Sequence, residues 1–403
     1  MYAEPDDPGL EQLRLVNTVA LLKRAKIMGK TRRFIRQCFY PQLIIGLSIL
    51  GGCDQSPNTE VDIQSSETSG IAASVREAPE WPTDGALVYV SNEDSGDVSI
   101  ISTATNEVVT SLSVGRRPRG IKVSYDGKKL FVALSGSPKC PPSMADEECE
   151  KKITDKTQDG IAVVDLLTAR VERVLPGGSD PEQFDVSADN RRLFVSNEDS
   201  DEATIVDIAS GKVIQTIPVT REPEGVRISP DGALVYVTGE TDHNVTVLDA
   251  TSGAVVATIG VGLRPRDAVF TTDGSRAFVS AELAHSIAVV NVKQHEVVAT
   301  IELDETAKPV GMAISSDDQR LYVANGRGKT VSAIDLNTLE VIGTVEVGPR
   351  PWGIGLTDDE RFLYTANGPS DDVSVIETES MQVVTTIRVG ASPWGIAIGP
   401  IPR

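Results

Sequence analysis

The stretch GVRISPDGALVYVTGETDHNVTVLDATSGAVVATI, residues 225–259, decides the fold. It contains four short segments rich in β-branched and aromatic residues, and these segments are residues 225–229, 234–238, 245–249 and 255–259. A Pro-Asp-Gly turn separates the first two, and a Thr-Ser-Gly turn separates the last two. Apolar alternation interrupted by turn residues predicts strands, so we expect this stretch to form one four-stranded antiparallel sheet.

The same unit recurs along the chain. An aromatic residue in the second segment marks each copy, and the copies lie at Tyr89, Phe131, Phe194, Tyr236, Phe278, Tyr322 and Tyr364. Their spacings are 42, 63, 42, 42, 44 and 42 residues. A period of about 40–45 residues with four strands per repeat is typical of propeller blades. Residues 83–403 are therefore predicted to form an all-β, seven-bladed β-propeller of four-stranded blades, with one insertion at residues 136–159.

The two ends of this domain predict how the ring closes. The domain begins near Leu87 with a segment of the second-strand type. It ends at residues 395–398 with a segment of the first-strand type that has no further strands of its own. We expect this C-terminal strand to join the first blade, because the ring then closes and no long sheet edge remains exposed.

The N-terminal region has the order of a bacterial lipoprotein signal peptide. A basic stretch, residues 23–36, precedes the apolar residues 43–50, which are too few for a membrane-spanning helix of about 20 residues. Leu50-Gly51-Gly52-Cys53 then resembles a lipobox, which predicts a signal peptide within residues 1–52 and a lipid on Cys53. We expect an exported cell-envelope lipoprotein on the periplasmic side of a membrane. An uncleaved signal anchor is the alternative, and Met28 is an alternative start to Met1.

Composition constrains the linker and the partners. Residues 53–82 are rich in Ser, Thr, Pro, Asp and Glu and poor in apolar residues, so they are predicted to form a disordered tether. The 38 Lys and Arg residues against 58 Asp and Glu residues give a net charge of −20, which repels a phosphate backbone. We therefore expect a monomer that binds no nucleic acid and contacts the membrane through its lipid.

One face of the predicted ring carries the candidate binding residues. The loops that enter each first strand and the loops that link second to third strands emerge on the same side, called here the top face. A proline precedes each first strand, and the residue after it varies: Arg119, Glu182, Glu224, Arg266, Val310, Trp352 and Trp394. Together with Arg117, Arg264 and Arg350, this ring is predicted to bind a planar or anionic small molecule, or a protein partner, at the channel mouth. Alternatively the two indoles only seal the mouth, and Glu182 and Glu224 are either solvated rim charges or partners of Arg119 and Arg266.

Cysteines and histidines suggest two further sites on the same face. Cys140 and Cys149 lie in the insertion and are expected to form a disulfide, because the protein is expected to be exported. Two His-Glu pairs at equivalent positions of neighbouring blades could ligate Zn, Fe or Mn, and they are Glu240, His243, Glu282 and His285. The alternative is that these four are ordinary polar residues of the rim. No other cofactor is expected.

Several motifs resemble known families. Tyr322-Val323-Ala324-Asn325 and the Val-Ser-Val-Ile of residues 373–376 resemble the bacterial YVTN-type β-propellers. More narrowly, the chain is similar to the β-propeller proteins associated with PQQ-dependent alcohol catabolism at residues 91–94, 180–184, 222–225 and 393–395. The resemblance implies an exported propeller that works beside quinoprotein dehydrogenases and a transport system. The lipobox and the cysteine-bearing insertion depart from that group.

No catalytic motif is present. The sequence contains no Gly-x-Ser-x-Gly, no His-Glu-x-x-His and no Gly-rich phosphate loop. Three classes of function therefore remain: a ligand-binding or partner-docking propeller, a metal- or haem-dependent enzyme, and a structural envelope lipoprotein. We expect the first, because a propeller scaffold by itself does not distinguish among the three and only the top-face residues point to chemistry.

Overall fold

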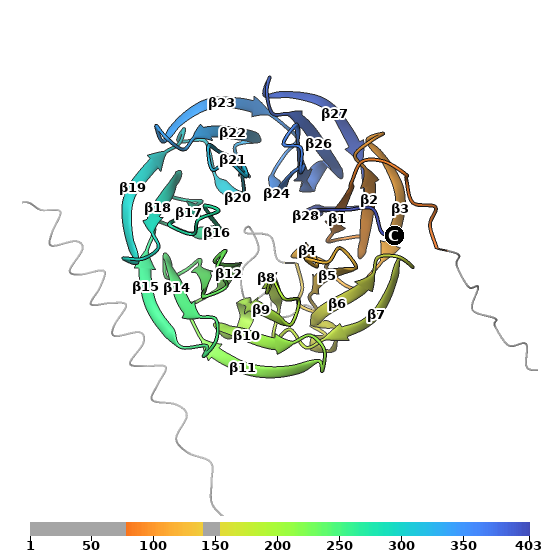
Figure 1. Cartoon of the computed structure of the whole chain (residues 1–403), viewed down its shortest axis with the longest axis horizontal. Helices are drawn as coiled ribbons and strands as arrows, with labels where there is room; N and C mark the ends of the chain where they lie inside the picture. Colours follow the sequence, from red (N-terminus) through yellow and green to blue (C-terminus); the bar gives the residue numbers. More distant parts are fainter. Residues whose placement is uncertain (1–77, 140–153) are drawn as a thin grey trace, which may run out of the picture. The chain divides into compact units, whose positions relative to one another are not determined.

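The computed structural model describes residues 78–139 and 154–403, and these residues form seven four-stranded sheets around a central axis (Figure 1). All ladders within the sheets are antiparallel, and the only helices in the described ranges are three single 3-10 turns. The predicted all-β, seven-bladed propeller with four-stranded blades is confirmed. Over the same ranges we find no helix with the length and apolar character needed to cross a bilayer.

Six blades consist of four consecutive strands that run from the channel outward. Blade 2 contains β4 (Ile121–Val123), β5 (Lys129–Leu134), β6 (Gly160–Asp165) and β7 (Arg170–Leu175). Blade 3 contains β8 (Pro181–Val186), β9 (Arg192–Asn197), β10 (Glu202–Asp207) and β11 (Lys212–Pro218). Blade 4 contains β12 (Pro223–Ile228), β13 (Leu234–Gly239), β14 (Asn244–Asp249) and β15 (Val255–Gly260). The strands expected within residues 225–259 thus begin and end within two residues of the observed ones.

The remaining blades repeat this order. Blade 5 contains β16 (Pro265–Phe270), β17 (Arg276–Ala281), β18 (Ser286–Asn291) and β19 (Glu296–Glu302). Blade 6 contains β20 (Pro309–Ile314), β21 (Arg320–Asn325), β22 (Thr330–Asp335) and β23 (Glu340–Glu346). Blade 7 contains β24 (Pro351–Leu356), β25 (Phe362–Asn367), β26 (Asp372–Glu377) and β27 (Gln382–Arg388). The 3-10 turns lie between second and third strands, at η1 (Lys156–Gln158), η2 (Glu198–Ser200) and η3 (Gly368–Ser370).

Blade 1 combines both ends of the described domain. Its strand order is β28 (Pro393–Gly399), β1 (Leu87–Asn92), β2 (Asp97–Ser102) and β3 (Glu107–Ser113). Tyr89 of β1 lies opposite Ala397 of β28 in an antiparallel register. The backbone groups of β1 that face the channel are therefore paired within the blade.

The turn between first and second strands explains why the repeat folds locally. In blade 4 the Ser229 hydroxyl donates to the Asp231 carboxylate at 2.6 Å, and the amide of Ala233 donates to the same carboxylate at 3.0 Å. Gly232 has φ 71°, a left-handed conformation that glycine adopts without steric cost. A Ser or Thr, an Asp and a tight turn thus hold the two strands in register.

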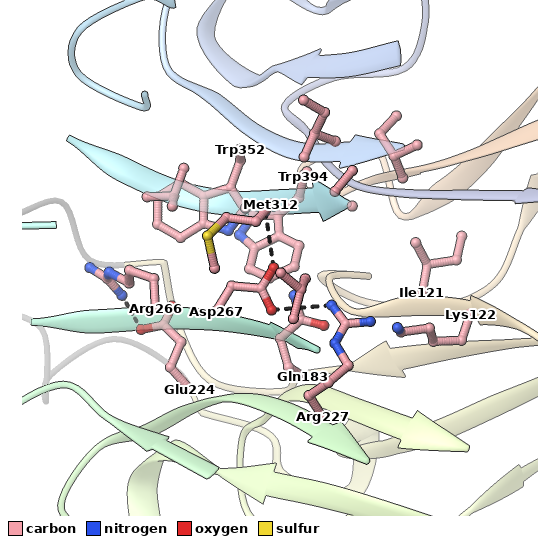
Figure 2. Close-up of a pocket in the computed structure, with 18 of the residues that line it drawn as sticks. Ile121, Lys122, Gln183, Glu224, Arg227, Arg266, Asp267, Met312, Trp352 and Trp394 are labelled. Carbon is pink, nitrogen blue, oxygen red and sulfur yellow. Dashed lines mark hydrogen bonds and ion pairs between the residues drawn. The ribbon is translucent and has the colours of Figure 1, made fainter. Parts of the chain in front are cut away.

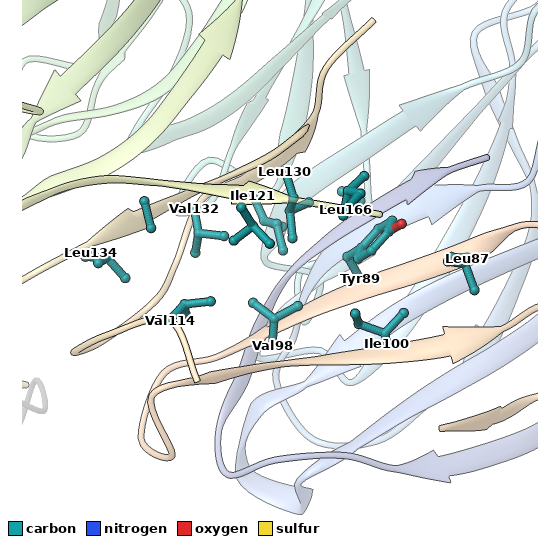
Figure 3. Packing of buried hydrophobic residues seen from close by; sticks show 13 residues of the cluster. Leu87, Tyr89, Val98, Ile100, Val114, Ile121, Leu130, Val132, Leu134 and Leu166 are labelled. Carbon is teal, nitrogen blue, oxygen red and sulfur yellow. The ribbon is translucent and has the colours of Figure 1, made fainter. Parts of the chain in front are cut away.

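The hydrophobic core lies between neighbouring blades. Figure 3 shows the cluster between blades 1 and 2, in which Tyr89 of β1 and Val98 of β2 pack with Leu130 and Val132 of β5. All four side chains are fully buried. Burial of each such side chain contributes roughly 1.5–3 kcal/mol, so the blades stabilise one another and hold the inner strands in place.

The predictions for the N-terminal region concern residues at or before the start of the described part of the chain. Trp81 packs against the core of blades 1 and 2, and its indole N–H donates to the Leu167 carbonyl at 3.2 Å. Contacts of the propeller therefore begin before residue 83. The signal peptide, Cys53 and most of the predicted tether lie outside the described residues, and so do Cys140 and Cys149.

Candidate ligand site in the central channel

The inner strands of the seven blades surround a cavity of about 320 Å³, called here the upper cavity (Figure 2). Residues of all seven blades line it, including Trp352 of blade 7, Trp394 of blade 1 and Arg266 of blade 5. It extends from the top face down to Ile314 and Leu356, the last residues of β20 and β24. Of the predicted ring, Glu224, Arg266, Val310, Trp352 and Trp394 line this cavity, whereas Arg119 and Glu182 do not.

The residues at the channel mouth differ in polarity from one side of the ring to the other. Directly after the proline that leads each inner strand, blades 2 to 5 carry charged residues, namely Arg119, Glu182, Glu224 and Arg266. At the same position blades 6, 7 and 1 carry apolar residues, namely Val310, Trp352 and Trp394. The channel mouth thus has one charged wall, in blades 2 to 5, and one apolar wall, in blades 6, 7 and 1.

The two indoles lie side by side on the apolar wall. Their ring centroids are 5.5 Å apart with an angle of 39° between the planes. The guanidiniums of Arg266 and Arg350 lie 5.2 Å and 5.0 Å from the Trp352 ring centroid, within cation–π range. Both indoles are half-buried, and both line the upper cavity. A flat aromatic surface is therefore available to a molecule in the channel.

Close backbone packing brings the indoles together. A Cβ at Gly353 of β24 would lie 2.7 Å from the carbonyl oxygen of Trp394 on β28. Because real Cβ atoms do not approach backbone that closely, only glycine lets these two inner strands come so near. Gly353 thus permits the close spacing of the pair, whereas Gly395 lies against the Arg119 carbonyl of the next blade.

The charged wall has its guanidiniums occupied. Arg266 is only 8% exposed, and it contacts Glu224, Glu240 and Glu282. Its Nε donates to Glu282 at 2.8 Å, and its Nη1 lies 2.5 Å from Glu240 Oε2. Arg264 adds contacts to Glu240 and Glu282. The alternative that Glu224 is a solvated rim charge is wrong, because it is buried as a partner of Arg266.

Arg119 forms the matching cluster between blades 2 and 3. It is buried and pairs with Asp180 and Glu182, while Glu198 lies 3.5 Å away. Glu182 is thus also a buried ion-pair partner. Arg117 pairs with Glu93 at 2.8 Å. Carboxylates of the protein thus engage the guanidiniums of Arg119 and Arg266, while Arg119 Nε is buried without a hydrogen-bond partner.

Carboxyl groups outnumber cations in these two clusters. Six carboxyl groups, those of Asp180, Glu182, Glu198, Glu224, Glu240 and Glu282, face four guanidiniums, those of Arg119, Arg264, Arg266 and Arg327. Burial raises the pKa of Glu224 well above its usual range, although Arg266 opposes the shift and Glu240 adds to it. Burial also raises the pKa of Glu198 to about 7, against the effect of Arg119. Burial thus favours the protonated forms of these two carboxyl groups.

The predicted His-Glu metal site does not form. The rings of His243 and His285 bond through Nδ1 to the carbonyls of Glu240 and Ala307, at 2.9 Å and 2.7 Å. The carboxylates of Glu240 and Glu282 instead point to guanidiniums. Residues 78–139 and 154–403 contain no group of three or more His, Cys, Asp or Glu side chains placed to hold a metal. The physical reason is that the guanidiniums of Arg264 and Arg266 engage the two carboxylates that a metal ion would need.

Sequence reasoning missed a second layer of charges in the middle of the channel. It lies on the inner strands of blades 2 to 5 and is called here the mid-channel belt, made of Lys122, Asp185, Arg227 and Asp267. Lys122 and Arg227 line the upper cavity below the indoles, and Figure 2 shows their charged ends pointing toward one another. A pattern in the sequence could have revealed the belt. Lys122, Asp185 and Arg227 occupy the same position in three consecutive blades, four residues after the proline.

Comparison with known proteins supports the propeller. A family model described as a seven-bladed β-propeller lactonase matches residues 251–386, and one described as a YNCE-like β-propeller matches residues 144–229. Each covers less than half of the chain. Antigen Lp49 of Leptospira interrogans is 30% identical over 110 residues, which is 27% of this chain and 23% of the antigen. The chain thus matches less than a quarter of that relative's length.

Solved structures show the same fold at low identity. A functionally unknown protein of Desulfotomaculum acetoxidans has a TM-score of 0.65 and 18% identity over 78% of this chain and 99% of that one. Hydrazine synthase of Kuenenia stuttgartiensis has a TM-score of 0.63 and 21% identity over 77% and 99%. A candidate 6-phosphogluconolactonase of Bacteroides uniformis has a TM-score of 0.66 and 16% identity over 78% and 99%. At such identities the likeness extends to the fold alone.

Proposed function

We propose that this chain is an exported, membrane-tethered propeller that binds a planar small molecule in the upper cavity, against Trp352 and Trp394. One observation carries the proposal: two half-buried indoles, 5.5 Å apart, line a cavity whose opposite wall is charged. Its volume of about 320 Å³ lies within the range of small-molecule sites. Carboxylates already pair with Arg119 and Arg266, which favours an uncharged planar ligand over an anion.

The location and the partners belong to the same proposal. The lipobox at Cys53 supports attachment to a membrane on its periplasmic side. The resemblance to quinoprotein-associated propellers supports an accessory role beside periplasmic oxidation or transport, in which the channel takes up a small molecule or presents it to a protein partner. Cys53→Ser should release the protein from washed membranes into the soluble fraction, because a lipid chain contributes about 0.8 kcal/mol per buried CH₂. Unchanged membrane fractionation would contradict the tether.

A planar fluorescent probe tests the binding site. We expect lumichrome, an uncharged heteroaromatic compound, to bind saturably, as measured by its fluorescence anisotropy. The double variant Trp352→Leu/Trp394→Leu should weaken binding by about tenfold or more, because truncation of a buried aromatic anchor commonly costs ~2 kcal/mol. Trp81→Phe is the matched control, since Trp81 bonds to Leu167 outside the channel. Equal affinity in a folded double variant, or no saturable binding up to about 1 mM, would count against the site.

Hydrolysis of a lactone is a second candidate, favoured by one observation. Glu198 lies at the channel mouth, 3.5 Å from Arg119, and its pKa of about 7 suits a general base at neutral pH. The partial match to the lactonase model is compatible with this activity. Purified protein should then hydrolyse glucono-δ-lactone above the spontaneous rate, and Glu198→Gln should remove the excess. A rate equal to the buffer control would exclude this candidate.

A further inference from the structure

A second cavity, of about 550 Å³, lies at the other end of the channel and is called here the lower cavity. The turns between first and second strands contribute to it, so it opens on the face opposite the indoles. Apolar and aromatic side chains form most of its wall, and they are Val123, Tyr125, Val186, Ile228, Val269, Phe270 and Ile314. Its inner end is formed by Lys122, Asp185 and Arg227 of the mid-channel belt. The lower cavity thus has an apolar body and a charged end.

The carboxylates of the belt are satisfied by backbone amides. Asp185 accepts hydrogen bonds from the amides of Val186 at 3.0 Å and Ile228 at 2.9 Å. Asp267 accepts from the amides of Ala268 at 2.8 Å and Met312 at 3.1 Å. Their positions are therefore fixed by the strands and not by the cations.

The cations of the belt keep donors that are free. Within the described ranges the Lys122 ammonium makes one ion pair, with Nζ 3.5 Å from Asp185 Oδ1. Arg227 donates through Nε to the Ala268 carbonyl at 2.8 Å and through Nη2 to Asp267 at 3.2 Å. The side chains of Lys122 and Arg227 remain 26% and 25% exposed, and that exposed surface lines the cavity. Both therefore present hydrogen-bond donors to the channel.

Electrostatic repulsion makes this end receptive to an anion. Burial lowers the pKa of Lys122, and the neighbouring Arg227 guanidinium lowers it further. An anionic group between the two would relieve that repulsion and accept hydrogen bonds from both. Because two carboxylates already balance two cations, the belt suits a singly charged head better than a doubly charged phosphate.

We propose that the lower cavity binds a singly charged amphiphilic anion, with a carboxylate or sulfonate head between Lys122 and Arg227 and an apolar body against Phe270 and Ile314. This site does not depend on the proposed planar-ligand site. The indoles lie at the opposite end of the channel and do not line the lower cavity. The two cavities share four lining residues, which are Lys122 and Arg227 of the belt together with Val269 and Ile314.

Calorimetric titration with decanoate tests the proposal. We expect saturable binding of one decanoate per chain, weakened about tenfold or more for decan-1-ol and for decylamine, because neither head group can accept charge-assisted hydrogen bonds as a carboxylate does. Lys122→Met keeps the length of the side chain and removes its charge, so it should weaken decanoate binding by a similar factor. Lys128→Met is the matched control, because Lys128 is 76% exposed and lies outside the lower cavity.

Two further measurements keep the result unambiguous. Tyr125 lines the cavity but is 66% exposed, so Tyr125→Trp should fold and its added emission should change on decanoate binding. The double variant Trp352→Leu/Trp394→Leu should bind decanoate as the parent does. The proposal is overturned if Lys122→Met and Lys128→Met bind equally, if decylamine binds as well as decanoate, or if loss of the two indoles abolishes decanoate binding. Failure of lumichrome binding alone would affect only the upper site.

Discussion

At the scale of single residues, the channel mouth depends on buried charges that balance one another. Arg266 holds three glutamates from two blades, and burial leaves little water to screen them. The desolvation of each group is offset only while its partners are present. The arginine is therefore essential to the arrangement of these carboxylates.

Removal of this arginine should be costly. Arg266→Met leaves Glu224, Glu240 and Glu282 with reduced compensation, and we expect a loss of ~3–5 kcal/mol in the free energy of unfolding. Chemical denaturation measures it. Arg221→Met is the control: Arg221 pairs with Asp242 but is 61% exposed, so its loss should leave the free energy of unfolding nearly unchanged. Similar destabilisation by both substitutions would show that the buried cluster has no special role.

Glu198 should make stability dependent on pH. Its folded-state pKa, about 7, lies above that of the unfolded chain, near ~4.3. Between these values the unfolded chain releases the proton first, so a rise in pH through this window lowers the free energy of unfolding. Glu198→Gln, which cannot ionise, should therefore gain stability over the parent near pH ~8 but not near pH ~5, by about 1 kcal/mol since the side chain is 38% exposed.

Thermal unfolding at the two pH values provides the measurement. Glu379→Gln is the control, because Glu379 is an exposed residue of the turn between β26 and β27. A gain for Glu198→Gln that is the same at both pH values would mean that this carboxyl group is not protonated in the folded protein.

At the scale of the element, the inner strands combine a repeated backbone with variable side chains. Glycine follows the variable position in five of the seven blades, at Gly120, Gly225, Gly311, Gly353 and Gly395. A Cβ at any of them would lie 2.3–2.8 Å from the carbonyl oxygen of the neighbouring inner strand. Blades 3 and 5 carry Gln183 and Asp267 there instead, and Asp267 belongs to the belt. The residue at this position therefore determines how closely two inner strands pack and, in blade 5, which charged group lies in the channel.

Gly353→Ala tests this close packing. The added methyl group would meet the Trp394 carbonyl at 2.7 Å, so β24 and β28 must separate, and we expect a loss of ~1–3 kcal/mol in stability together with altered indole fluorescence. Gly260→Ala is the matched control, since nothing lies within 4 Å of a Cβ there. Equal stability of the two variants would show that the inner strands tolerate a wider spacing.

At the scale of the whole molecule, contacts between blades stabilise the ring, and one blade is formed from both ends of the propeller domain. β28 pairs with β1 and also carries Trp394, one of the two indoles of the upper cavity. The same strand therefore serves the architecture and the candidate site.

Two deletions compare the contributions of the C-terminal strand and of the tether to thermal stability. Deletion of residues 393–403 should lower the melting temperature of the whole propeller, because it exposes an edge of β1 and removes one inner strand. Deletion of residues 54–77 should leave the melting temperature unchanged. Differential scanning calorimetry compares both with the full chain. A C-terminal truncation as stable as the parent would contradict the role of β28 in ring closure.

The sequence by itself determined the repeat, the seven blades, the four strands of each blade and the face on which the variable residues gather. These features are local or periodic: alternation predicts strands, Asp-Gly turns predict hairpins, and a 42-residue spacing predicts blades. Even the proximity of Trp352 and Trp394 followed from their equivalent positions in neighbouring blades.

Only the tertiary structure decided which charges meet. Arg119 finds Asp180 and Glu182, and Arg266 finds Glu224, across the gap between adjacent inner strands. These residues are about 40 or more positions apart in the sequence. Which side chains form ion pairs with one another could therefore not be predicted from the sequence. That choice depends on the distance between strands, on burial and on competing partners. The arginines and glutamates of the mouth therefore form ion pairs with one another, and Lys122 and Arg227 of the belt are the cations that keep exposed surface in the channel.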